Sequence, residues 1–353
     1  MRILIIAPNW IGDAVMSLSL LQALHADASL NNADGSPCEI HVLAPPVTAP
    51  VYQFTPTVKS VQVEPFVHGK LQWGLRRQVG RALAIEGFDR AIMLPNSLKS
   101  ALVPFFARIP QRVGYDGELR TAVLTHPLPK PSKLNKPPMI QWYGDLGGYP
   151  KHQLANPVLV VSDKQRQEVV REFGLQGEFL VLAPGAEFGP AKRWPAPHFA
   201  AVGRDYLLAH QANSGGPTRG AISSQVVLLG GPKDAEFSQQ IRSLMPAGLQ
   251  AQVQVLAGKT SLPQAISLMA AAKALVTNDS GLMHVGAALN VKVHAVYGSS
   301  SPHHTPPLNP SAKVHYLQLD CSPCYQRECP LGHTDCLNKL LPDQVSQALL
   351  LPQ

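Results

Sequence analysis

Short apolar segments alternate with helix-forming segments along almost the whole chain, and this alternation constrains the fold most strongly. The predicted strands span residues 2–7, 39–43, 58–63, 89–94, 179–183, 225–229, 253–256 and 273–277. Helical patterns lie between them, at residues 14–28, 71–85, 162–173, 195–210, 234–244, 262–271 and 281–289. Strand–helix alternation of this kind is typical of a parallel sheet covered by helices on both faces. The sequence therefore predicts an α/β protein.

At 353 residues the chain is long for a single core, so two domains are expected. We place the first domain at residues 1–156 and the second at 157–335, followed by a terminal helix within 336–353. A Pro- and Lys-rich stretch, residues 126–138, is predicted to be exposed and extended. Residues 211–224 resemble a flexible surface insertion.

Charge and hydropathy limit the cellular setting and the partners. No apolar run reaches the ~18 residues that a membrane-spanning helix needs, and the N-terminus resembles a first strand rather than a secretion signal. A cytoplasmic protein is expected, with peripheral contact with a membrane also compatible. The net charge is +7, and the excess is larger in the first half. That half suits a phosphorylated substrate, an anionic membrane or nucleic acid, although a solvated basic surface explains it equally well.

One strand-to-helix turn, residues 275–284, is suited to bind an anion. Asp279, Ser280 and Gly281 stand where an apolar strand ends and a small-residue helix begins. Such a turn presents backbone N–H groups and the positive end of the helix dipole. His284 follows Ser280 by four residues, on the same helix face. A phosphate site and a simple N-cap are both compatible with this pattern.

Three other turns offer charged residues. Asp13, after the first strand, could accept a proton from a bound hydroxyl or simply favour the helix start. The Gly/Pro-rich loop 183–195 carries Lys192 and Arg193, which could neutralise phosphates or be a solvated surface pair. After the strand ending at 229, Asp234 and Glu236 could bind a ribose or cap a helix.

Four of the five cysteines fall close together, at Cys321, Cys324, Cys329 and Cys336, with His333 among them. Clustered cysteines in a cytoplasmic protein favour a structural metal site over disulfides. The spacing differs from a paired zinc ribbon, so a thiol-rich loop without metal is an equal alternative, and the metal content is left open.

Several common motifs are absent from the sequence. There is no Gly-x-Gly-x-x-Gly after the first strand, no P-loop, no Gly-x-Ser-x-Gly and no His-Glu-x-x-His. The Asp-x-Asp motif of metal-dependent sugar transfer is also missing. Dehydrogenase, P-loop NTPase, serine hydrolase and zincin classes are therefore disfavoured.

Three long motifs together resemble the ADP-heptose:lipopolysaccharide heptosyltransferases of glycosyltransferase family 9. They are Pro-Asn-Trp-Ile-Gly-Asp at 8–13, Pro-Gly-Ala-Glu-Phe-Gly-Pro-Ala-Lys-Arg-Trp-Pro at 184–195, and Asn-Asp-Ser-Gly-Leu-Met-His at 278–284. The cysteine-bearing tail and the longer loop at 186–190 look like those of the type II members. The insertion at 211–224 departs from the expected pattern, away from these motifs.

The resemblance implies a GT-B fold, with two Rossmann-like domains facing across a central cleft, and inverting transfer without a catalytic metal or other cofactor. It implies that Asp13 is the general base. It implies a donor site for ADP-L-glycero-D-manno-heptose made of Gly185, Ala186, Lys192, Asp279, Ser280, Gly281 and His284.

The implied acceptor is the first heptose on Kdo-lipid A, at the cytoplasmic face of the inner membrane. The basic residues Arg76, Arg77, Lys130, Lys133 and Lys136 suit such a phosphorylated lipid. No nucleic-acid partner is expected. Two alternatives remain at this stage: an enzyme that adds the first heptose to Kdo, and a non-catalytic nucleotide-sugar-binding protein on the same fold.

Overall fold

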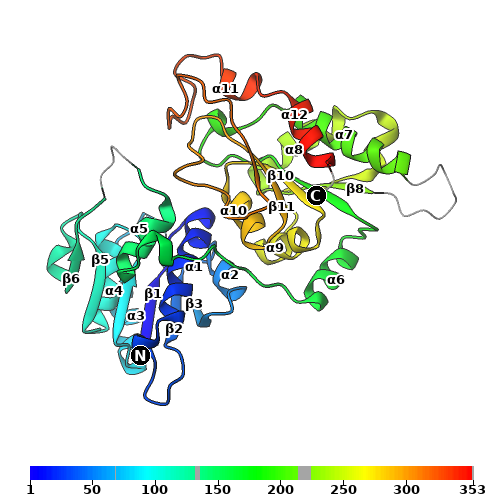
Figure 1. Cartoon of the computed structure of the whole chain (residues 1–353). Helices are drawn as coiled ribbons and strands as arrows, with labels where there is room; N and C mark the ends of the chain where they lie inside the picture. Colours follow the sequence, from blue (N-terminus) through cyan, green and yellow to red (C-terminus); the bar gives the residue numbers. More distant parts are fainter. Residues whose placement is uncertain (68, 132–135, 214–223, 352–353) are drawn as a thin grey trace. The chain divides into compact units, whose positions relative to one another are not determined.

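The computed structural model describes residues 1–67, 69–131, 136–213 and 224–351, and these form two compact units that divide after Val160 (Figure 1). Each unit contains a sheet of six parallel strands. Residues 132–135 of the predicted extended stretch lie outside the described residues, and so does most of the predicted insertion at 211–224. Lys133, which was predicted to suit a phosphorylated lipid, is one of these residues.

The first unit has the strand order β3-β2-β1-β4-β5-β6. Its strands are β1 (Arg2–Ile6), β2 (Glu39–Ala44), β3 (Val58–Val63), β4 (Arg90–Met93), β5 (Gln111–Tyr115) and β6 (His126–Leu128). Its helices are α1 (Ile11–Ala26), α2 (Ala49–Gln53), α3 (Trp73–Leu83), α4 (Leu98–Phe106) and α5 (Met139–Gly147). Helices α3 and α4 pack together over a core that contains Leu4, Ala91 and Met93, while α1 packs against α5 and α2.

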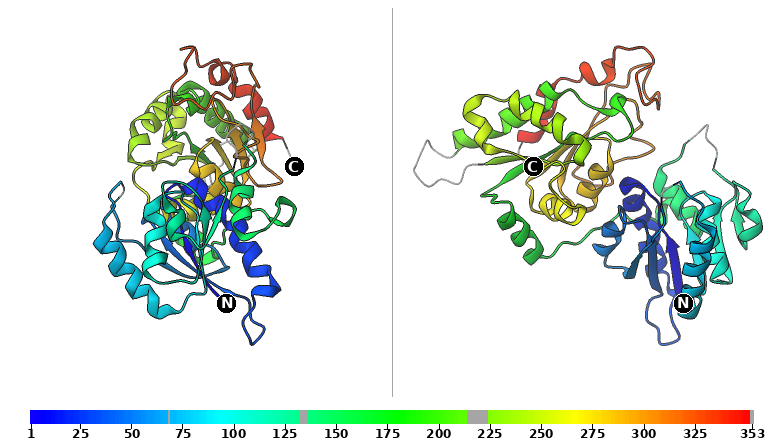
Figure 2. Two further views of the ribbon diagram at one scale, coloured as in Figure 1. Left: turned by 90° about the vertical axis from the view of Figure 1, so that its left-hand side faces the viewer. Right: turned by 180° about the vertical axis from the view of Figure 1, so that it is seen from behind.

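The second unit repeats this topology, since its order β12-β11-β10-β7-β8-β9 read from the other edge is again 3-2-1-4-5-6. Its strands are β7 (Phe179–Ala183), β8 (Gln225–Leu228), β9 (Val253–Val255), β10 (Ala274–Asn278), β11 (Lys292–Val296) and β12 (Lys313–His315). Its helices are α6 (Asp163–Glu172), α7 (Ala196–Asn213), α8 (Ala235–Ser243), α9 (Leu262–Ala271), α10 (Gly281–Ala288), α11 (Asp335–Asn338) and α12 (Pro342–Leu350). This is the doubly wound order of dinucleotide-binding folds, present twice in one chain. Figure 2 shows the ribbon of the chain from two further sides.

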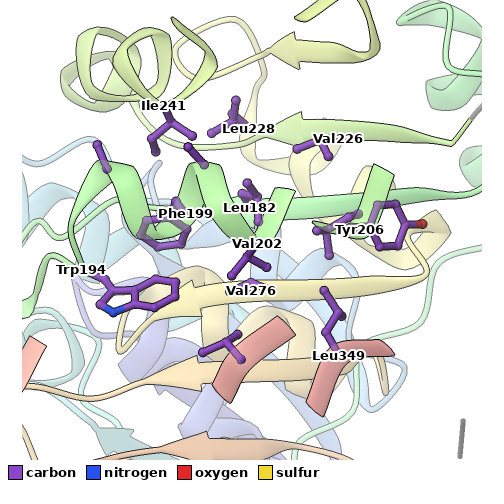
Figure 3. Close-up of a cluster of buried hydrophobic side chains, with 14 of the residues drawn as sticks. Leu182, Trp194, Phe199, Val202, Tyr206, Val226, Leu228, Ile241, Val276 and Leu349 are labelled. Atoms are coloured by element: carbon purple, nitrogen blue, oxygen red, sulfur yellow. The ribbon is translucent and has the colours of Figure 1, made fainter. Parts of the chain in front are cut away.

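The core of the second unit lies between its sheet and the helices α7, α8 and α12. Phe199, Val202 and Tyr206 of α7 pack against the strands, and Leu349 of α12 closes the same cluster (Figure 3). Strand β7 is buried at every position because helices cover both faces of a parallel sheet. The terminal helix is therefore part of the core of the second unit.

The stretch at 126–138, predicted to be exposed and extended, begins with an exposed edge strand, β6, which pairs with β5, in agreement with the prediction. Two other predictions need correction. Strands β5, β11 and β12 were not predicted. Arg76, predicted on the polar side of its helix, is buried: its Nε donates to the Leu71 carbonyl, and its guanidinium lies 3.9 Å from the centre of the Phe66 ring.

Candidate functional site

The topology of each sheet indicates where a ligand binds. In doubly wound sheets, ligands bind outside the carboxyl ends of the strands, at the point where the strand order reverses. That point lies between β1 and β4 in the first unit and between β7 and β10 in the second. The segments that follow these four strands contain Asp13 in the first turn of α1, Pro95–Asn96, Gly185 and Asp279, so three of the four carry residues predicted from the sequence.

In the second unit, Lys192 and Asp279 form a buried ion pair. Lys192 Nζ donates to Asp279 Oδ2 at 2.5 Å, and their side chains are only 18% and 3% exposed. Asp279 stands directly after β10, where its backbone N–H donates to the Val296 carbonyl at 3.1 Å. Because Lys192 comes from the loop after β7, the pair joins the two turns at the switch point.

Asn278 fixes the same two turns through its buried amide. Its Nδ2 donates to the carbonyls of Pro184 at 2.8 Å and Gly185 at 3.4 Å, and its Oδ1 accepts from the Trp194 backbone N–H at 3.1 Å. Asn278 is fully buried, and every one of these bonds crosses between β10 and the loop after β7. Asn278 belongs to the motif at 278–284, but no role for it was predicted from the sequence.

The turn from β10 into α10 is the predicted strand-to-helix turn. Ser280 is the N-cap residue and Gly281 the first residue of the helix, with no side-chain hydrogen bond capping it. The Ser280 hydroxyl lies 3.3 Å from that of Thr277. The first backbone N–H groups of α10 have no partner within the helix and lie at the positive end of the helix dipole.

His284 lies one turn into α10 and is 4% exposed. Burial lowers the pKa of its imidazole to about 4, with Lys192 contributing in the same direction and Asp279 opposing both. The ring is therefore neutral at pH 7, beside the Lys192–Asp279 pair.

The remaining predicted residues on this side lie in two neighbouring turns. Ala186 is 5% exposed, and a Cβ at Gly185 would lie 2.7 Å from Asp234 Oδ2, so the loop needs glycine there. Asp234 Oδ2 accepts from the Gly231 backbone N–H at 2.9 Å, which is the capping alternative for this residue. Glu236 is exposed in the first turn of α8.

The first unit has a pocket of about 200 Å³ next to Asp13. Asp13 lies in the first turn of α1, one turn after the switch-point strand β1. The pocket is lined by Pro8, Asn9, Trp10, Asp13, Leu94, Pro95, Asn96, Tyr115, Met139, Trp142 and Tyr143. A carboxylate among aromatic rings is suited to a sugar, because the rings cover its C–H faces while the carboxylate contacts a hydroxyl.

Sequence reasoning missed Arg120, the residue that supports this pocket from behind. It is fully buried, and its guanidinium donates to the carbonyls of Pro95 at 2.5 Å and Tyr115 at 2.6 Å. It also donates to Asn96 Oδ1 at 3.2 Å. An isolated Arg after a strand carries no pattern, so only the fold reveals this role.

The cysteine cluster does not form a metal site within the described residues, since no group of three or more His, Cys, Asp or Glu side chains there could hold a metal ion. All five cysteines are free thiols, and Cys336 is buried. A larger, open pocket of about 380 Å³ between α6 and α9 contains none of the predicted site residues.

Comparison with known proteins agrees with this geometry. The family described as "Glycosyltransferase family 9 (heptosyltransferase)" matches residues 76–335. Lipopolysaccharide heptosyltransferase 2 of Escherichia coli is 39% identical, over 99% of this chain and 97% of its own. Lipooligosaccharide heptosyltransferase 2 of Haemophilus influenzae is 38% identical, over 89% and 88%.

Among solved structures, that of E. coli ADP-heptose lps heptosyltransferase II aligns with a TM-score of 0.83. It has 36% sequence identity and covers 99% of this chain and 97% of that one. The predicted α/β fold with two Rossmann-like domains, of the GT-B class, is confirmed. The predicted enzyme class is confirmed as well, and the chain belongs to glycosyltransferase family 9, the heptosyltransferases.

Proposed function

We propose that this enzyme transfers L-glycero-D-manno-heptose from ADP-heptose to the first heptose of Kdo-lipid A. The observation that carries the proposal is the Lys192–Asp279 pair at the N-terminus of α10, a charged site at the switch point of a nucleotide-binding sheet. The names of the relatives that cover nearly the whole chain support the same acceptor.

In the proposed reaction, Asp13 removes the proton from the acceptor hydroxyl. The hydroxyl oxygen attacks the anomeric carbon of heptose, and the bond from that carbon to the donor phosphate oxygen breaks, so ADP leaves with both electrons. Attack opposite the leaving group inverts the anomeric configuration. Lys192 and the N-terminal N–H groups of α10 stabilise the charge that develops on the departing diphosphate.

The acceptor sugar is proposed to bind in the pocket that contains Asp13. Trp10 and Trp142 provide its aromatic walls, and Asn96 provides an amide for a sugar hydroxyl. Gly185, Ala186, Ser280, Gly281 and His284 are proposed to surround the nucleotide-sugar. The neutral His284 can donate or accept a hydrogen bond without adding charge.

Mass spectrometry of the product from ADP-heptose and heptosyl-Kdo-lipid A tests the proposal. The wild type should add one heptose. Asp13→Asn should reduce kcat by about 10²–10⁴-fold, the contribution of a general base. Asp34→Asn is the matched control, because Asp34 lies in a surface turn where it accepts from Ser36.

A non-catalytic nucleotide-sugar-binding protein would bind ADP-heptose without forming product. An Asp13→Asn variant that kept full activity would refute the base role while leaving transfer itself intact. Transfer to Kdo-lipid A lacking heptose would assign the chain to the first of the two heptose additions.

We further propose that the enzyme works peripherally at the cytoplasmic face of the inner membrane. Among the described residues, no helix is long and apolar enough to cross a membrane. Trp73, Arg77 and Arg81 instead share one exposed face of α3, at i, i+4 and i+8, and Trp73 is 51% exposed. Leu71, also exposed, precedes them. An apolar and cationic surface of this kind fits an anionic bilayer.

Co-sedimentation with vesicles tests this surface. Binding to phosphatidylglycerol vesicles should exceed binding to phosphatidylcholine vesicles, and Trp73→Ser combined with Arg77→Ser should remove most of the difference. Lys164→Ser combined with Arg171→Ser, on the exposed face of α6, is the control. Equal binding by wild type and the α3 variant would refute the assignment.

A further inference from the structure

The cysteine-bearing tail packs directly against the loop that carries Lys192. The Arg327 carbonyl accepts from the Ala191 backbone N–H at 3.0 Å. A Cβ at Gly189 would lie 2.4 Å from the same carbonyl oxygen, so only glycine allows the loop to approach this closely. The tail therefore fixes the turn that immediately precedes Lys192.

A third segment, the turn after β11, joins these two. The Ser299 backbone N–H donates to the Ala191 carbonyl at 3.3 Å, and Tyr325 N–H donates to the Ser299 carbonyl at 2.7 Å. The Ser322 hydroxyl donates to the Gly298 carbonyl at 2.5 Å. The tail is thus held at several points to the turns at the carboxyl edge of the second sheet, including the loop that carries Lys192.

Two cationic side chains, one from the loop and one from the tail, contact the same aromatic ring. Lys192 Nζ lies 5.2 Å from the centre of the Phe188 ring, and Arg327 Cζ lies 5.6 Å from it. Phe188 is 36% exposed, and Arg327 is exposed as well. The guanidinium of Arg327 and the ammonium group of Lys192 are therefore close to each other, next to the same ring.

A bound diphosphate would need a second cation besides Lys192. Lys192 already shares its charge with Asp279, and the nearby Lys233 is paired with Glu187 at 2.9 Å. Among the described residues, Arg327 takes part in none of the ion pairs. A diphosphate brings more negative charge than the Lys192–Asp279 pair can balance, and a guanidinium binds phosphate oxygens in a bidentate manner.

We propose that Arg327 is a second cationic ligand for the diphosphate of the donor, delivered by the cysteine-bearing tail. The inference rests on the proposed function, since it assumes that the donor binds next to Lys192. It assigns a binding role to a segment whose only earlier interpretation was a possible metal site or a thiol-rich loop.

Calorimetric titration with ADP, AMP and adenosine tests the proposal. Arg327→Ala should weaken ADP binding by about tenfold or more, the value of a charge-assisted hydrogen bond. Adenosine binding should stay within about twofold, because adenosine lacks the phosphates. Arg327→Lys should fall between wild type and Arg327→Ala. Arg171→Ala, at an exposed arginine of α6, is the matched control.

The ligand series separates binding from structure. If Arg327→Ala weakens ADP and adenosine equally, Arg327 only supports the loop and the proposal is wrong. Unchanged ADP binding would also refute it. A wild-type protein that binds neither ADP nor ADP-heptose would instead refute the proposed function, and this inference with it.

Discussion

Replacing Lys192 by Met should destabilise the second unit, because it leaves Asp279 without its partner at 3% exposure. Removing one partner of a buried ion pair costs about 3–5 kcal/mol. Since 18% of the Lys192 side chain is exposed, we expect the lower end, about 3 kcal/mol. For a domain of this size that corresponds to a fall in Tm of about 6–12 °C.

Asp279→Asn should rescue part of that loss, because it removes the uncompensated charge. The double variant should therefore be more stable than Lys192→Met, with a coupling energy of about 2 kcal/mol in a double-mutant cycle. Calorimetric unfolding of wild type, both single variants and the double variant gives the four values needed. The cycle also separates stability from binding, because it uses no ligand.

Lys233→Met is the matched control, since it removes a lysine from a pair whose side chains are 81% and 62% exposed. Its effect should stay below about 1 kcal/mol. If Lys192→Met matched this control, or if Asp279→Asn brought no rescue, the buried pair would not hold the two turns together.

Three further changes have defined outcomes. Burial lowers the pKa of His284 from 6.5 to about 4, so its stabilising contribution is complete above pH 6.5 and is lost as the pH falls toward 4. The difference in unfolding free energy between wild type and His284→Gln, measured with urea, should show this slope, and parallel pH profiles would refute it. Arg120→Lys cannot satisfy the carbonyl acceptors behind the pocket, so chemical denaturation should show a loss of about 2–4 kcal/mol, whereas a loss below about 0.5 kcal/mol would contradict the buried network. Gly189→Ala should displace the Lys192 loop from Arg327 and weaken ADP binding at least about tenfold in calorimetric titration. Gly248→Ala adds a Cβ in open space and should leave ADP binding unchanged. Equal ADP affinities of the two variants would refute the close contact at Gly189.

The sequence was most informative where chemistry and backbone geometry coincide. Asp13, Gly185 and Asp279 each follow an apolar strand, so the strand pattern alone placed them at the carboxyl edge of a sheet. That pattern also predicted the α/β class. It could not predict that Lys192 and Asp279 would pair, since 87 residues separate them and only the adjacency of β7 and β10 brings them together.

Other features left no local signal. Arg76 was predicted at the surface from helical periodicity, yet the Phe66 ring and two backbone carbonyls accommodate it in the interior. Arg120 had no pattern at all, because its partners come from the turn after β4 and from the end of β5. The contact between Arg327 and the loop at Gly189 likewise depends on tertiary folding of irregular segments.

The ratio of kcat/KM for two acceptors, with ADP-heptose as donor, tests the proposed acceptor most directly. One acceptor is Kdo-lipid A carrying a single heptose, and the other is Kdo-lipid A without it. We expect strong preference for the heptosylated lipid, with one heptose added in the inverted configuration. Preference for the bare lipid would contradict the proposed acceptor, and turnover of neither would contradict the proposed reaction.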